Sequence, residues 1–95
     1  MIDKQLKKQL KAAANGLKPL YQIGKNEISD NTLELLKNGL RSRELIKISV
    51  LKSVEASPQQ LGERLATLLE AELVQVIGRV ITLYKLNPQI RKYER

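Results

Sequence analysis

Apolar residues along this chain change their spacing, from the period of a helix to that of a strand and back. The clearest strand is Glu44–Leu51, in which Ile46, Ile48 and Val50 alternate with polar residues. Stretches with apolar residues every three or four positions lie on both sides of it, and that period is typical of amphipathic helices. A strand between two helices favours a layered α/β fold, with helices packed on a sheet.

The first helical segment is basic. Residues 3–14 place apolar side chains at helical spacing, and lysines occupy the other faces. Asp3 can cap its start, and we expect Asn15-Gly16 to supply the left-handed residue that ends it. The predicted buried positions are Leu6, Leu10 and Ala13 or Ala14.

Two further helices carry their own start signals. The second is expected to begin after a Ser29 cap and to run to about Ser42. The third follows Ser57-Pro58, which places proline at the first helical position and Gln60 three residues after the cap. The apolar stripes predicted for burial are Leu33, Leu36 and Leu40 in the second helix, and Leu61, Leu65, Leu68 and Leu69 in the third.

The remaining strands are a short edge strand and a hairpin. Pro19 cannot donate to a ladder, so Leu17–Ile23 is expected to be an edge strand or the beginning of a strand. Leu73–Tyr84 predicts a hairpin with Gly78-Arg79 as its two-residue turn. The pairs expected from that turn are Ile77 with Val80, Val76 with Ile81, Gln75 with Thr82, Val74 with Leu83 and Leu73 with Tyr84. The order is therefore αβαβαββ, an α/β (α+β) domain with a four-stranded mixed sheet.

Composition excludes several kinds of function. The 95 residues contain neither cysteine nor histidine, which removes the usual zinc ligands and nucleophile–base pairs. The ten carboxylates show no catalytic spacing. We therefore expect no enzyme, no metal, no cofactor and no small-molecule substrate. No apolar run approaches the ~20 residues of a membrane span, so the sequence predicts a cytoplasmic protein, and we expect a monomer.

The net charge of +7 lies at the two ends of the chain. Residues 1–25 carry six lysines against one aspartate, and residues 75–95 carry five basic residues against one glutamate. Between them, residues 26–74 are slightly acidic. If the fold brings the ends together, they form a basic patch suited to a polyanion. Two solvated basic ends that keep the protein soluble are the alternative.

Four short stretches in this order resemble the CRM domain, the chloroplast RNA splicing and ribosome maturation domain, in its stand-alone bacterial YhbY-like form. They are Leu17-Lys18-Pro19, Ile23-Gly24-Lys25-Asn26, Glu44-Leu45-Ile46-Lys47-Ile48, and Val74-Gln75-Val76-Ile77-Gly78-Arg79 with Leu83-Tyr84. The resemblance covers about residues 3–86 and leaves 87–95 as a polar, basic tail. It implies an RNA-binding domain similar in fold to the C-terminal domain of bacterial translation initiation factor 3. It also implies a role in assembly of the large ribosomal subunit, with ribosomal RNA as partner.

One loop departs from the family pattern. The family has Gly-x-x-Gly, usually with lysine second, whereas this chain has Gly24-Lys25-Asn26-Glu27. Glutamate lacks the conformational freedom of glycine and repels phosphate. The alternative function is therefore a protein–protein adaptor on the ribosome that has lost its grip on RNA through this loop.

The candidate RNA-binding residues each have a structural alternative. Lys25 can pair with a phosphate or be an unpartnered loop lysine. Gly24 and Asn26 can contact RNA or can simply form the turn. Arg41 and Arg43 suit the negative end of a helix dipole as well as RNA, and Arg79 is expected to be exposed at the hairpin tip. The complete set is Lys7, Lys8, Lys11, Lys18, Gly24, Lys25, Asn26, Arg41, Arg43, Arg79 and Lys85.

Overall fold

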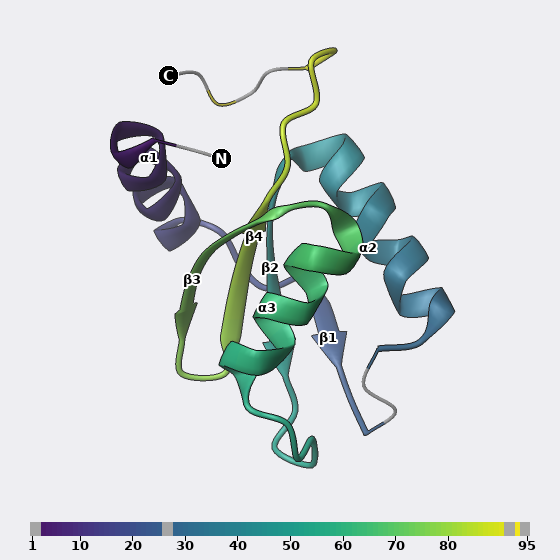
Figure 1. The fold of residues 1–95 in the computed structure, drawn as a ribbon. Helices are drawn as coiled ribbons and strands as arrows, with labels where there is room; N and C mark the ends of the chain where they lie inside the picture. The colour runs from purple at the N-terminus through teal and green to yellow at the C-terminus, as the bar shows by residue number, and fades with distance from the viewer. Residues whose placement is uncertain (1–2, 26–27, 91–92, 94–95) are drawn as a thin grey trace.

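The computed structural model describes residues 3–25, 28–90 and 93. Within them the chain forms three helices and four strands in the predicted order αβαβαββ (Figure 1). The elements are α1 (Lys4–Asn15), β1 (Tyr21–Ile23), α2 (Asp30–Arg43), β2 (Leu45–Val50), α3 (Pro58–Leu69), β3 (Glu72–Ile77) and β4 (Val80–Tyr84).

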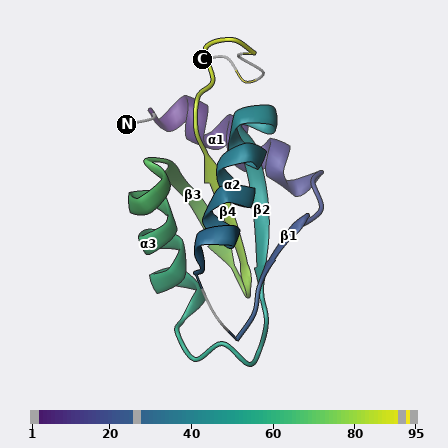
Figure 2. The same ribbon diagram turned by 90° about the vertical axis from the view of Figure 1, so that its right-hand side faces the viewer.

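The four strands form one mixed sheet in the order β1-β2-β4-β3. Strand β1 runs parallel to β2, and β4 is antiparallel to both β2 and β3. Helices α2 and α3 pack on one face of the sheet. Helix α1 lies on the other face, where it crosses the strands near one of their ends (Figure 2). The result is a three-layer arrangement with two separate apolar cores.

The predicted helix starts are confirmed. The side chains of Asp3, Ser29 and Ser57 accept hydrogen bonds from backbone N–H groups three residues on, at 2.8, 3.2 and 3.1 Å. Gln60 completes the capping box at Ser57. The predicted end of α1 is wrong, because Gly16 has φ −90° and is right-handed. Its N–H bonds to the Ala13 and Ala14 carbonyls without a left-handed residue.

The larger core lies between the sheet and helices α2 and α3. The alternating residues of β2 predicted for the core face are buried there, together with apolar residues of both helices. Leu68 was predicted to belong to this stripe, but it is 51% exposed. It lies on the flank of α3, and Leu61, Leu65 and Leu69 fill the interface instead.

The smaller core lies beneath α1. Leu6, Leu10 and Ala14 pack on the opposite face of the sheet, so Ala14 is the buried member of the predicted alanine pair. This face of β2 is less open to water than expected. Leu45 is buried in the second core, and Lys47 donates to the carbonyls of Ala14 and Leu17 at 3.0 and 3.1 Å.

The hairpin follows the predicted register only near its turn. Gly78 opens the turn with φ +58°, a conformation that glycine adopts without steric cost. The pairs from Ile77–Val80 to Gln75–Thr82 are as predicted. Beyond them a bulge at Val74 shifts the register, so that Leu73 pairs with Leu83 and Glu72 with Tyr84.

The bulge has a packing reason. It lets Val74 enter the core beneath α1, while Leu73 turns to the α3 side. Leu73 there approaches Gly62 so closely that a Cβ on that glycine would meet Leu73 Cδ1 at 2.9 Å.

Strand β1 is also shorter than the predicted Leu17–Ile23 segment, since only Tyr21–Ile23 pairs with β2.

Candidate nucleic-acid interface

The predicted basic residues are divided between the two ends of the sheet. We call the end where β2 begins and β4 finishes the Leu45 end. The other end, where β1 and β2 finish and the hairpin turns, we call the Val50 end. In Figure 1, α2 ends and the chain leaves β4 at the Leu45 end, whereas the loop after β1 lies at the Val50 end.

Three predicted residues lie at the Val50 end: Gly24, Lys25 and Arg79. Backbone hydrogen bonds join the elements that carry them. The Leu51 N–H donates to the Ile23 carbonyl at 2.9 Å, and the Val50 N–H donates to the Arg79 carbonyl at 2.8 Å. The Lys25 side chain is exposed. Among the described residues of this end, Lys25 is therefore the predicted cation whose side chain is exposed.

Arg79 is not the exposed side chain that the sequence predicted. It is half-buried, and its guanidinium donates from Nε to the Val50 carbonyl at 2.9 Å and from Nη2 to the Leu51 carbonyl at 2.7 Å. Those two donors form one of the forks with which arginine binds a phosphate. The hairpin turn thus uses this fork to hold the end of β2.

The glycine loop is described only in its first half. Gly24 does not have a positive φ, so its backbone conformation does not require glycine. A Cβ there would touch Leu51 Cδ1 at 3.4 Å. The candidate residue Asn26 and the unusual Glu27 lie outside the described residues.

The other predicted cations lie toward the Leu45 end. Helix α1 packs there against Leu45, Tyr84 and Tyr93, so the N-terminal helix adjoins the C-terminal segment. Its Lys7, Lys8 and Lys11 are exposed. Lys18 and Arg43 line a cavity of about 40 Å³ with Lys47 and both Tyr21 and Tyr93.

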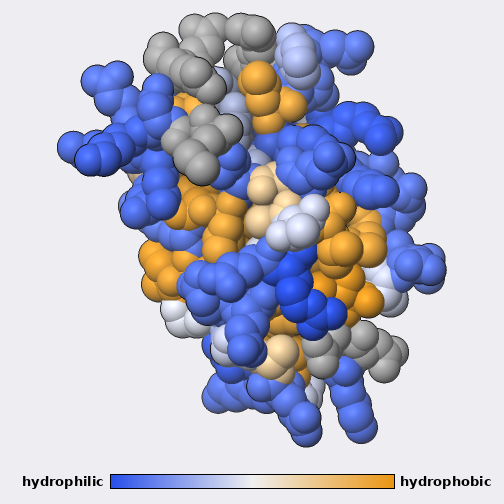
Figure 3. Space-filling model, in the orientation of Figure 1, coloured by the Kyte–Doolittle hydropathy of each residue, from blue (hydrophilic) through white to orange (hydrophobic). Residues whose placement is uncertain are grey.

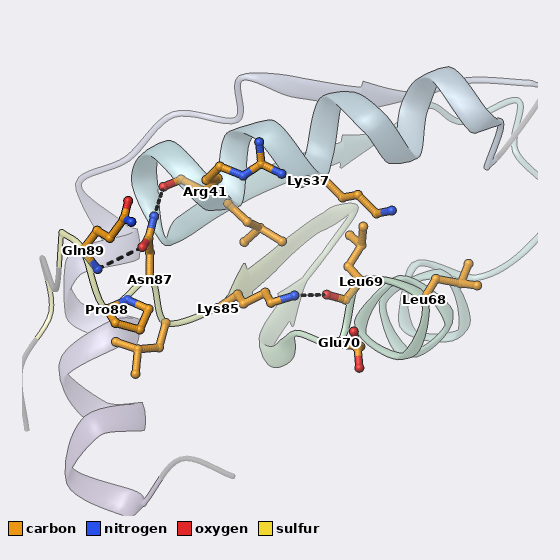
Figure 4. Close-up of a pocket in the computed structure, with 11 residues that line it drawn as sticks. Lys37, Arg41, Leu68, Leu69, Glu70, Lys85, Asn87, Pro88 and Gln89 are labelled. Atoms are coloured by element: carbon orange, nitrogen blue, oxygen red, sulfur yellow. Dashed lines mark hydrogen bonds between the residues drawn. The ribbon is translucent and has the colours of Figure 1, made fainter.

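Arg41 and Lys85 both line a larger groove (Figure 4). It has a volume of about 450 Å³ and lies between the last turns of α2 and α3 and the segment that follows β4. Lys37 also lines it, a residue that the sequence reasoning missed. Its position four residues before Arg41 was the available signal, because residues at that spacing share a helix face. In Figure 4 both side chains lie along the α2 rim.

Hydrogen bonds hold the C-terminal side of this groove in place. Lys85 Nζ donates to the Leu69 carbonyl at 3.0 Å, and Asn87 Nδ2 donates to the Arg41 carbonyl (2.6 Å). The Asn87 N–H donates to Glu44 Oε2 at 2.7 Å. The segment after β4 is therefore fastened to the ends of both helices.

Glu44 is the second residue that sequence reasoning missed. It is fully buried directly after α2, with φ +64°. Its carbonyl also accepts from Lys85 N–H at 2.9 Å. Burial raises the pKa of the nearby Tyr93 hydroxyl above its ordinary value of 10.0, and the Glu44 carboxylate raises that pKa further.

The described residues contain no group of three or more histidine, cysteine or acidic side chains able to hold a metal ion. Across the same ranges, no helix is both long enough and apolar enough to cross a membrane.

A family model, the CRS1 / YhbY (CRM) domain, matches residues 2–85. The chain belongs to the CRM family. The Bacillus subtilis protein YqeI, named a probable RNA-binding protein, is 35% identical over 99% of this chain and 98% of its own length. The Methanocaldococcus jannaschii protein MJ0652, with the same description, is 34% identical over 94% of this chain and 67% of its own length.

A solved structure shares the CRM fold seen here. It is the solution structure of SAV1595 from Staphylococcus aureus, described as a candidate RNA-binding protein. The two chains are 34% identical, with a TM-score of 0.83 and coverage of 99% of this chain and 98% of the other. The order αβαβαββ and the mixed sheet are thus those of a CRM protein.

Proposed function

We propose that this CRM protein binds RNA without catalysing a reaction on it, and that its target is ribosomal RNA in a precursor of the large subunit. The carrying observation is its membership of a family whose related proteins are named for RNA binding. The narrower target follows the ribosome-maturation role that the family resemblance implies.

The placement of the cations supports this proposal. Exposed lysines of α1 lie on one side of the Leu45 end, and Lys37, Arg41 and Lys85 lie around the groove on the other. Among the described residues, neither Lys37 nor Arg41 has a side-chain hydrogen bond or ion pair. Unpaired cations are available to phosphates, and release of counterions from RNA then drives binding.

Contacts to the phosphate backbone suit this chain better than stacking on an aromatic surface. It has three tyrosines and neither phenylalanine nor tryptophan. Tyr84 is buried, with its ring in edge-to-face contact with Tyr93 at a centroid distance of 6.4 Å. Proteins that read single strands on a sheet use several exposed rings.

A salt titration with ribosomal RNA fragments tests the proposal. The affinity should fall by orders of magnitude between low and moderate salt. Reversing Lys7, Lys8 and Lys11 to glutamate should weaken binding strongly and flatten the salt dependence. The control is reversal of Lys52, an exposed lysine in the loop after β2, whose effect per reversed charge should be smaller. Equal RNA affinity in the triple variant and the parent would refute a role for α1.

Sedimentation of a lysate separates the ribosomal target from other RNAs. The protein should migrate with precursors of the large subunit and leave them at high salt. Association that resists both high salt and ribonuclease would support the protein–protein adaptor instead.

A further inference from the structure

We propose that the groove between α2, α3 and the segment after β4 receives a single unpaired nucleotide of the bound RNA. The phosphate lies at the α2 rim, and the base lies on the apolar wall. This inference rests on the proposed RNA binding and adds a defined site and ligand to it.

The groove has the size of a small-ligand site and a mixed polar and apolar lining. Its volume of about 450 Å³ lies within the usual range of ~300–1,000 Å³ for such sites. Two large apolar side chains on its wall remain accessible, with Leu68 51% and Leu86 44% exposed. Figure 3 shows apolar patches between hydrophilic side chains on the side of the molecule that carries α3. A base stacked on Leu68 would cover apolar surface that otherwise faces water.

Charge places the phosphate on one side of the groove. Lys37 and Arg41 lie one helical turn apart on the α2 rim, and their side chains have no hydrogen-bond or ion-pair partner among the described residues. Glu70 lies on the α3 side of the groove (Figure 4). Its carboxylate repels a phosphate there, so the phosphate is favoured at α2 and the base at Leu68.

Helix ends normally oppose an anion at this position, because their free carbonyls carry partial negative charge. Here two of those carbonyls are already occupied. Asn87 donates to the Arg41 carbonyl, and Lys85 donates to that of Leu69. An ammonium group has three donors, so Lys85 keeps its charge and two N–H groups for the ligand.

Methyl NMR with mononucleotides tests the site directly. Uridine 5′-monophosphate should shift the Leu68 methyl signals, and uridine or inorganic phosphate alone should shift them less. Equal shifts from phosphate alone would overturn the nucleotide site in favour of a simple anion site. No shift from the mononucleotide, in a protein that still binds ribosomal RNA, would overturn the inference and leave the proposed function intact.

Two variants test the same groove with RNA. Leu68→Ser should weaken binding to RNA with an unpaired loop by about three- to tenfold, because the base loses its apolar contact. It should leave binding to a fully paired duplex unchanged. The matched control is Leu35→Ser, since Leu35 is 61% exposed on α2 but does not line the groove. Equal effects of the two substitutions, or equal losses with loop and duplex, would overturn the proposal.

The predicted phosphate contact at the α2 rim is tested separately. The double variant Lys37→Gln with Arg41→Gln should lower the slope of log affinity against log salt by about one, since the loss of one neutralised phosphate contributes ~0.7–0.9. Lys52→Gln, which removes a cation away from the groove, should change the slope less. A slope in the double variant equal to that of the parent would refute phosphate contact here.

Discussion

The backbone N–H of Asn87 donates to the buried carboxylate of Glu44 at 2.7 Å, across 43 positions of sequence. Glu44 follows the last residue of α2, and Asn87 lies three residues after β4. The contact therefore holds the C-terminal segment against the end of α2. It builds one wall of the groove that we propose for RNA.

Glu44→Ala should lower the free energy of unfolding by about 1–3 kcal/mol, because it leaves the Asn87 N–H without its acceptor. Urea unfolding followed by circular dichroism measures this change.

Glu70→Ala is the matched control. Glu70 also ends a helix with positive φ, at +54°, but it is exposed. Its replacement should change stability by less than about 0.5 kcal/mol, and equal losses in the two variants would mean that backbone strain, not the hydrogen bond, is responsible.

Tyr93 should titrate above the ordinary tyrosine range. Burial and the Glu44 carboxylate raise the pKa of its hydroxyl above 10.0, so the folded state holds this proton more tightly than the unfolded state. The resulting stabilisation is present below pH 10.0 and is lost as the pH rises through the folded-state pKa. Ultraviolet titration of the parent against Tyr93→Phe isolates this ionisation. A Tyr93 component at or below 10.0 would contradict the prediction.

Features set by neighbouring residues were predictable from the sequence. The caps at Asp3, Ser29 and Ser57 depend on bonds that span three positions. The alternation in β2 and the Gly78-Arg79 turn are equally local, and both are confirmed. These local signals were sufficient to establish the element order.

Features set by contacts between residues far apart in the sequence were not predictable from it. The bulge at Val74 depends on where α1 and α3 lie, because it sends Val74 and Leu73 to opposite cores. The burial of Glu44 depends on Asn87. Likewise, the carbonyls that accept from the Arg79 side chain lie 28 and 29 positions away in the sequence. The sequence around the turn therefore predicts an exposed arginine, because it does not show that β2 lies beside the turn.

Arg79→Lys should act mainly on the fold. Lysine keeps the charge but cannot reproduce the two-pronged contact with Val50 and Leu51. We expect the free energy of unfolding to fall by roughly 0.5–1.5 kcal/mol and the RNA dissociation constant to change by less than about twofold. Urea unfolding and fluorescence anisotropy measure the two quantities. A large loss of RNA affinity with unchanged stability would show that the guanidinium contacts RNA.

The glycine loop gives the last prediction. Lys25 is exposed and attracts phosphate, whereas Glu27 opposes it by about 0.5–1 kcal/mol at moderate salt. Glu27→Gly should raise RNA affinity by roughly two- to tenfold, the upper figure needing ~1.4 kcal/mol, and Lys25→Ala should lower it. Gly24→Ala is the control for loop shape, because Gly24 needs no positive φ and, among the described residues, a Cβ there meets only the exposed Leu51. It should fold with a stability within about 1 kcal/mol of the parent. If the Lys25 and Glu27 variants both bind ribosomal RNA like the parent, the loop only turns the chain, and the cations at the Leu45 end must carry the binding.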